Sequence, residues 1–233
     1  MNSLELRGDQ GAMLQAETEP KLYTCGRVSG GVSAHVLCAV FTATVAVLSK
    51  PGSSLFSWHP FLMTLAFSFI MTEAILLFST HSSLFRKAKH QTKARLHWIL
   101  QSLSASCAVF GFGAIVYNKH VHGKPHFTSW HGLIGVITVC VAVLQSVGGL
   151  AILYPKLAKG WSLAKLKRSH AAFGLVAYLL GSASVVLGTS SAWFTGRVTG
   201  YAWYMMAFCP ALGALVVMSQ VTNAYMAKKR LQS

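Results

Sequence analysis

Ser-Trp-His-Pro at residues 57–60 opens one long apolar stretch of the chain, and Ser-Trp-His-Gly at 129–132 opens another. A second pair of segments, Lys-Ala-Arg-Leu-His at 93–97 and Lys-Arg-Ser-His at 167–170, opens two further apolar stretches. The offset from His59 to His131 is one position shorter than the offset from His97 to His170. These near-equal offsets indicate an internal repeat in which each copy carries two histidines. Parallel repeats in membrane proteins are usually related by a pseudo-two-fold axis along the membrane normal.

The composition predicts that these apolar stretches cross a membrane. Of the 233 residues, 53% are hydrophobic and 11% are charged, whereas a soluble domain carries about 25% charged residues. A helix of roughly 20 apolar residues crosses a bilayer core about 30 Å thick, and a helix satisfies its own backbone hydrogen bonds there. The stretches of this length are approximately 29–49, 57–79, 96–117, 131–153, 170–192 and 201–226.

We therefore predict an all-α, polytopic membrane protein with six transmembrane helices. The membrane domain covers residues 29–226, after a flexible N-terminal tail at 1–28 and before a basic tail at 227–233. The second to fifth helices contain the repeat, so we expect them to form a four-helix core with pseudo-two-fold symmetry.

The basic residues indicate how the helices are oriented. The chain has 20 Lys and Arg residues, five Asp and Glu residues and a formal net charge of +15. Sixteen of the 20 basic residues lie in the two tails, the second–third loop and the fourth–fifth loop. Cytoplasmic loops of membrane proteins are enriched in Lys and Arg, so we predict that both termini are cytoplasmic. The charge is then explained by topology and by contact with the lipid bilayer, and we expect no nucleic-acid partner.

The scarcity of carboxylates excludes several classes of site. Four of the five acids lie in the first 19 residues, and Glu73 is the only later one. A two-carboxylate hydrolase, a carboxylate-bridged di-iron bundle and an oxygen-ligated calcium or magnesium site would all lack ligands. Glu73 follows His59 by almost four whole turns of an α-helix, so we predict that it points into the core. It would be a functional acid there, or form an ion pair with a loop Lys or Arg or a hydrogen bond to a group that faces the cofactor. His35 has no repeat counterpart and is interpreted as a packing or hydrogen-bonding residue.

The repeated histidines are the candidate ligands. His59 and His131 open helices that enter from the non-cytoplasmic side, and His97 and His170 open helices that enter from the cytoplasmic side. The pseudo-two-fold axis turns each pair to face its partner, an arrangement that suits two bis-histidine haems. Two ligands per level are too few for structural zinc. Copper remains an alternative, as does a purely structural role as hydrogen-bonded packing residues.

Small residues follow two of these histidines on the same helix faces. They stand 4, 11 and 18 residues after the histidine, within roughly 40° of it at about 100° per residue. Such a smooth wall suits a porphyrin, although small residues also let membrane helices approach one another. The residues are Gly135, Ala142 and Gly149 after His131, and Gly174, Gly181 and Gly188 after His170.

Residues 30–226 resemble the cytochrome b561 family of six-helix, di-haem transmembrane reductases. The resemblance is carried by the segments PGSSLFSWHP at 51–60, AKLK at 164–167, LGSAS at 180–184 and AWY at 202–204. It implies that four histidines hold two haem b groups. Helix two pairs with helix four through His59 and His131, and helix three pairs with helix five through His97 and His170.

The resemblance also implies an activity. Cytosolic ascorbate would give single electrons to the cytoplasmic haem, and the second haem would reduce monodehydroascorbate or a ferric chelate on the far side. Lys93 and Arg95 match basic residues that precede the third-helix ligand in the family, and His120 resembles a family histidine near the outer substrate site. His120 belongs to a basic cluster that could also be a solvated loop. The residues of this cluster are Lys119, His120, His122, Lys124 and His126.

Some features depart from the family pattern, and other functions stay open. Phe78-Ser79 stand where the ascorbate-using members have Tyr-Arg, and Trp130-His131-Gly132-Leu133 replace the usual Leu-His-Ser-Trp. The resemblance allows a homodimer, and we expect an endoplasmic reticulum or vesicle membrane. One alternative is a haem-bearing subunit that passes electrons to quinone or to a partner protein. Another is a haem-free transporter or scaffold with histidines as polar links.

Overall fold

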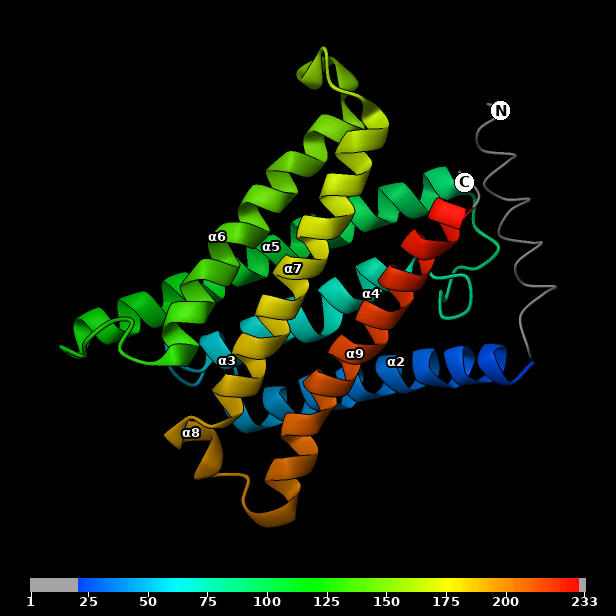
Figure 1. Cartoon of the computed structure of the whole chain (residues 1–233). Helices are drawn as coiled ribbons and strands as arrows, with labels where there is room; N and C mark the ends of the chain where they lie inside the picture. The colour runs from blue at the N-terminus through cyan, green and yellow to red at the C-terminus, as the bar shows by residue number, and fades with distance from the viewer. Residues whose placement is uncertain (1–20, 231–233) are drawn as a thin grey trace.

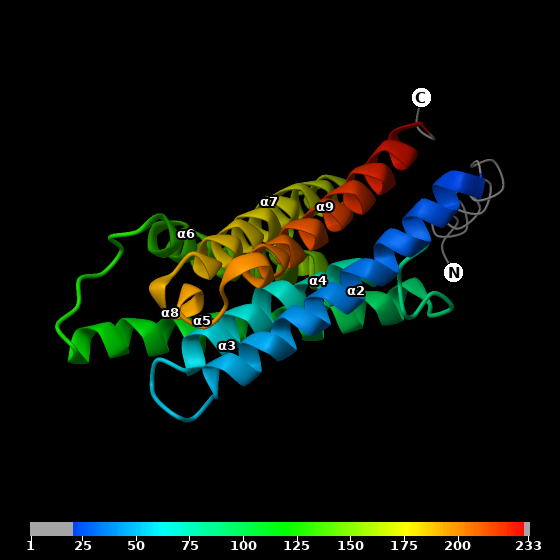
Figure 2. The same ribbon diagram turned by 90° about the horizontal axis from the view of Figure 1, so that it is seen from below.

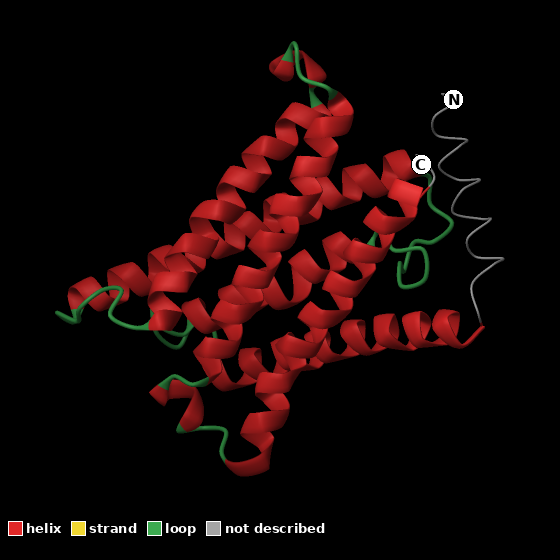
Figure 3. Cartoon of the chain, in the orientation of Figure 1, coloured by secondary structure: helices red, strands yellow, loops and turns green. Residues whose placement is uncertain are grey.

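The computed structural model describes the backbone of residues 21–230 and the side chains of residues 23–226. The first 20 residues of the predicted N-terminal tail, with four of the five acids, lie outside the described residues, as do residues 231–233. The described part of the chain consists of helices and loops (Figure 3). The predicted all-α class is confirmed.

Six helical segments are long and apolar enough to cross a membrane, as predicted. The second span is composite, with a π-helix between two α-helical parts. The spans are α2 (Lys21–Ser49); α3 (Trp58–Thr64) with η1 (Leu65–Ile70) and α4 (Met71–Leu76); α5 (His90–Val121); α6 (Trp130–Leu153); α7 (Leu163–Thr189); and α9 (Gly200–Arg230). Two short helices, η2 (Pro155–Ala158) and α8 (Ala192–Thr195), lie in loops.

Several helices extend beyond the predicted apolar limits. Residues 21–28, predicted to belong to the flexible tail, form the start of α2, and α9 continues to Arg230. α5 and α7 also begin six or seven residues before their predicted starts. The added turns contain polar and basic residues. Hydropathy marks only the apolar part of a helix, whereas long Lys and Arg side chains let the helix continue into the interface.

The helix ends gather on two sides of the molecule (Figure 1). We name the side with the start of α2, the end of α9 and loops 77–89 and 154–162 the terminal side. The side with loops 50–57, 122–129 and 190–199 is the opposite side. Successive spans run between these two sides in alternating directions, as expected for a six-span membrane protein.

The second span, α5, α6 and α7 pack in a ring, which is the four-helix core predicted from the repeat. α2 packs against the second span, α9 packs against α7, and α2 and α9 also contact each other (Figure 2). Inside the core, the hydroxyls of Thr72 and Tyr178 lie 2.9 Å apart and join α4 to α7. The Ser104 hydroxyl donates to the Ala66 carbonyl at 3.0 Å and joins α5 to η1.

The closest approach between η1 and α7 depends on Gly181. A Cβ atom there would lie 2.6 Å from Cδ1 of Phe67, whose side chain is buried. This glycine, predicted to be part of a porphyrin wall, instead accommodates an aromatic ring of the second span.

Gly181→Ala should therefore lower the free energy of unfolding by about 1–3 kcal/mol, because the buried Phe67 ring or a helix must move. The measurement is thermal or denaturant unfolding of the purified protein in detergent. Gly148→Ala is the matched control, since a Cβ there meets nothing within 4 Å. Equal stability of the two variants would contradict this account of the packing.

Candidate functional site

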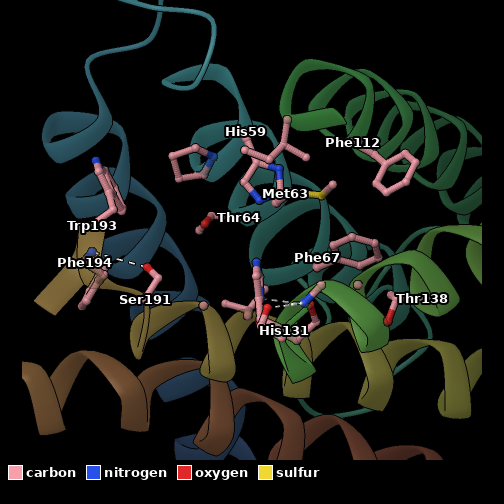
Figure 4. Close-up of a pocket in the computed structure, with 18 of the residues that line it drawn as sticks. His59, Met63, Thr64, Phe67, Phe112, His131, Thr138, Ser191, Trp193 and Phe194 are labelled. Carbon is pink, nitrogen blue, oxygen red and sulfur yellow. Dashed lines mark hydrogen bonds between the residues drawn. The ribbon is translucent and has the colours of Figure 1, made fainter. Parts of the chain in front are cut away.

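Two pairs of histidine rings face each other inside the four-helix core. His59 on α3 and His131 on α6 have ring centres 6.0 Å apart and ring planes at 76° (Figure 4). His97 on α5 and His170 on α7 have ring centres 6.3 Å apart and ring planes at 77°. The structure thus brings together the same two pairs that the repeat predicts, one near each side of the molecule.

Hydrogen bonds from the rings to neighbouring helices orient three of the four histidines. Nδ1 of His59 donates to the carbonyl oxygen of Gly111 at 3.0 Å, and Nδ1 of His131 donates to that of Ser184 at 2.8 Å. Nδ1 of His97 donates to the carbonyl oxygen of Ala74 at 2.9 Å. Because a carbonyl oxygen only accepts, the proton lies on Nδ1 and the Nε2 lone pair is left for a metal.

The fourth histidine has a different partner. The side-chain amide of Gln145 on α6 lies 3.0 Å from Nδ1 of His170 and 2.5 Å from the His170 carbonyl oxygen. A Cβ at Gly174 would lie 3.0 Å from the same amide, so this glycine makes room for Gln145. Sequence reasoning missed Gln145. A signal was present, because the interval from His131 to Gln145 equals the interval from His59 to Glu73.

Two glycines make room for the histidine rings. A Cβ at Gly188 on α7 would lie 3.2 Å from Cε1 of His131, and one at Gly149 on α6 would lie 3.3 Å from Cε1 of His170. The two contacts are reciprocal, since each glycine follows one histidine by about five helical turns and faces the ring of the other. These positions keep the rings free to face their partners on α3 and α5.

An apolar cavity of about 280 Å³ lies beside His59 and His131. Figure 4 shows both rings among the aromatic side chains that surround it. Lys119 near the end of α5 and His126 in loop 122–129 line it towards the opposite side. The lining also includes Phe56, Phe67, Phe112, Phe127, Trp193 and Phe194.

The donor set fits an iron porphyrin. Two imidazoles bound to one metal from opposite sides, each through a nitrogen about 2 Å away, have ring centres roughly 6 Å apart. Among the described residues, no group of three or more His, Cys, Asp or Glu side chains could hold a metal ion. A metal between two facing histidines therefore needs its other ligands from a non-protein group, and a porphyrin supplies four nitrogens in the plane between two axial ligands.

The predicted substrate residues lie at the two ends of α5. Lys93 is half-buried and Arg95 is exposed, both in the turns just before His97 on the terminal side. His120 is exposed in the last turn of α5 on the opposite side and does not line the cavity. Its neighbour Lys119 does, with Nζ donating to the Pro125 carbonyl at 3.0 Å.

The predicted direction of Glu73 is wrong. Oε1 of Glu73 lies 2.7 Å from Nδ1 of His35, so the acid faces α2 outside the four-helix core. The predicted direction assumed an unbroken α-helix from His59. The π-helix η1 adds a residue to one turn and rotates the later positions around the helix axis. Its partner is the intramembrane His35, and not a loop Lys or Arg, which was one of the predicted alternatives.

Known proteins similar in sequence to this chain belong to one family of membrane reductases. Residues 58–195 match the family model of eukaryotic cytochrome b561. The chain is 53% identical over 219 residues to the transmembrane reductase CYB561D2 of Mus musculus, covering 94% of this chain and 99% of that protein, and equally identical to the Homo sapiens protein. It is 31% identical over 178 residues to a Bos taurus lysosomal membrane ascorbate-dependent ferrireductase, CYB561A3, covering 71% of this chain and 64% of that protein.

Replacing histidines should separate the two centres. His59→Ala/His131→Ala should bind about half of the normal haem, because the other pair keeps its own contacts. His59→Ala/His97→Ala, which breaks both pairs, should bind almost none. The measurement is haem per protein from the absorption spectrum of the purified variants. His120→Ala is the control and should bind the full amount. A within-pair double variant that loses all haem while staying folded would contradict the pairing.

Proposed function

The chain belongs to the eukaryotic cytochrome b561 family of transmembrane reductases, and we propose that it moves single electrons from cytosolic ascorbate through two haem b groups to monodehydroascorbate or a ferric chelate. The observation that supports this most strongly is the presence of two facing histidine pairs, one near each side. Two separate centres are what a transmembrane electron path requires, since one centre near a single surface would leave most of the membrane uncrossed.

His97 and His170 would hold the haem nearer the terminal side, and His59 and His131 would hold the other. When bound, haem supplies reversible one-electron chemistry. The protein orients the ligands: the Nδ1 hydrogen bonds fix the rings of His59, His97 and His131 and strengthen their binding through Nε2. The apolar lining around His59 and His131 keeps water from that ligand pair.

The separation of the two levels supports a direct path. Gly111, whose carbonyl binds His59, follows His97 on α5 by about four helical turns. Ser184, whose carbonyl binds His131, follows His170 on α7 by the same interval. At 1.5 Å per residue, both helices put the two histidine levels about 21 Å apart. This separation is smaller than the thickness of the bilayer core, and packed helices connect the two levels.

The terminal side would be the cytosolic side, because 15 of the 20 basic residues lie in its two loops and in the helix ends next to them. Lys93 and Arg95 would attract the ascorbate anion to the entrance beside His97. The ascorbate-dependent activity in the name of the Bos taurus relative supports this donor. A homodimer and an endoplasmic reticulum or vesicle membrane stay predictions.

The opposite side would carry the acceptor site. Lys119 and His126 line the cavity next to His131 and would attract an anion such as monodehydroascorbate or a ferric chelate. His120 lies one residue beyond Lys119 and would extend this positive entrance. The aromatic lining would exclude water from the contact between acceptor and haem.

Ascorbate sealed inside proteoliposomes should reduce external ferric citrate, detected as ferrous iron trapped by a chelator, only when the protein carries haem. Liposomes with the His59→Ala/His97→Ala protein are the control for leakage. If dithionite reduces the haems and ascorbate does not, ascorbate is not the donor, and a quinone or a partner protein takes its place.

Lys93→Gln/Arg95→Gln should lower kcat/KM for ascorbate by on the order of tenfold, because two favourable charges are lost at a partly exposed site. The haem spectrum should be unchanged. Lys165→Gln/Lys167→Gln removes the same charge from the start of α7 on the same side and is the matched control. Equal effects of the two double variants would exclude a specific donor site at the start of α5.

A further inference from the structure

Glu73 and His35 form an acid–imidazole pair within the spans, outside the four histidines. Glu73 is the only carboxylate side chain beyond residue 19. Its Oε1 lies 2.7 Å from Nδ1 of His35, and the two side chains are only 16% and 15% exposed. An acid inside a membrane span is costly and is kept where it has a partner and a function.

The contacts of His35 fix how many protons the pair holds. Nε2 of His35 lies 2.7 Å from the carbonyl oxygen of Ser82, which only accepts, so Nε2 carries a proton. Nδ1 faces a carboxyl oxygen at hydrogen-bonding distance, so a second proton lies between Nδ1 and Oε1 of Glu73. The pair is then either imidazolium with carboxylate or imidazole with carboxylic acid. Both forms are neutral overall, which the apolar surroundings favour.

The pair is next to a ligand of the terminal-side centre. Glu73 precedes Ala74, whose carbonyl oxygen accepts the hydrogen bond from Nδ1 of His97. Phe78, one turn further on, has its ring centre 5.3 Å from that of His97. Opposite charges attract strongly at short range in a medium of low dielectric, so an added electron at this centre favours an added proton on the pair.

The pair also reaches the terminal side through loop 77–89. The Ser82 hydroxyl donates to the carbonyl oxygen of Arg27 on α2 at 3.4 Å, and the Gln220 amide on α9 donates to the Ser82 hydroxyl. A Cβ at Gly31 would overlap Ser82, so this glycine lets the loop lie against α2. Ser82, the loop residue that binds His35, is thus held by α2 and α9. It lies at the terminal side, from which protons would arrive.

Other ionisable groups surround the pair and must be separated from it in any test. Cys38 on α2 has its Sγ 3.7 Å from Oε1 of Glu73, and Tyr178 on α7 binds Thr72 next to Glu73. α9 contributes the amide of Gln220, which is not ionisable. Further ionisable groups at this end include Arg27 on α2 and His90, Lys93, Arg95 and His97 on α5; loop 77–89 adds His81, Arg86, Lys87 and Lys89.

The second copy of the repeat lacks such a pair. The counterpart of Glu73, at the same offset that relates His131 to His59, is Gln145, which contacts His170 directly. An amide has no proton to exchange in this way. The acid is therefore specific to one copy, and Glu73→Gln gives the first copy the side chain that the second already has.

We propose that His35 and Glu73 form a redox-linked proton site that takes up one proton when the centre held by His97 and His170 gains an electron. This inference rests on the proposed function. The neutral pair becomes imidazolium with carboxylic acid, so one negative and one positive charge arrive together. Oxidation of the ascorbate monoanion to monodehydroascorbate releases one electron and one proton, which supplies both. The pair returns the proton when the electron moves on.

The test is electrochemical titration of the purified holoprotein between about pH 5 and 8, with mediators, so that ascorbate is not needed. In part of this range the reduced-to-oxidised ratio of one centre should change about tenfold per pH unit at fixed potential, equivalent to about 59 mV for one electron. A pH-indicator dye should report about one proton taken up per electron. A redox-difference infrared spectrum should contain a carboxylic acid band.

Glu73→Gln should at least halve the pH dependence and remove the infrared band, while the other centre stays unchanged. His35→Asn should also lose the pH dependence, so the proposal remains testable if one variant does not fold. Gln220→Leu is the matched control: it loosens the same loop, removes no ionisable group and should keep the wild-type slope.

Three results would overturn the proposal. One is a wild-type protein without proton uptake, another is an unchanged slope in Glu73→Gln, and the third is an equal loss in Gln220→Leu. Failure of ascorbate to reduce wild-type protein that still shows the mediated pH slope would instead reject the donor and leave the proton site standing.

Discussion

The hydrogen bonds between histidine rings and backbone carbonyls are the constraint on which the rest of the core depends. His59 on α3 binds the carbonyl of Gly111 on α5, and His97 on α5 binds that of Ala74 on α4. These two hydrogen bonds join the second span to α5 at two levels, and a shift of one helix along the other by one residue would break both. The same bonds set the tautomer that a metal needs, so helix register and ligand chemistry are fixed by the same atoms.

These two hydrogen bonds explain why a π-helix lies in the second span. The segment from His59 to Ala74 is one residue longer than the segment from His97 to Gly111, yet both segments join the same two levels. η1 absorbs the additional residue by placing more residues in one turn. α6 is an unbroken α-helix, and there Gln145, the counterpart of Glu73, reaches His170 with its side chain. The two copies of the repeat thus differ in the winding of this helix.

The sequence was sufficient to predict the six spans and both histidine pairs, because apolar length and repeat spacing are linear properties of the chain. It did not predict where helices end, since Lys and Arg turns at the start of α5 and α7 look polar while remaining helical. Nor did it predict the direction of Glu73, because no residue in 65–70 distinguishes a π-turn from an α-turn. The pair with His35 joins two different helices that lie far apart in the sequence, so it follows only from their packing.

The two histidine pairs have almost the same geometry, with ring distances of 6.0 and 6.3 Å and ring angles of 76° and 77°. Any preferred direction of the proposed electron flow would therefore come from the surroundings of the two pairs. On the opposite side, these surroundings are an apolar cavity with Lys119 and His126. On the terminal side, Gln145 contacts His170. There, Glu73, paired with His35, also lies next to the Ala74 carbonyl that accepts the hydrogen bond from His97. The repeat supplies two equivalent histidine pairs, and residues outside the repeat pattern, His35 above all, make the two sides chemically different.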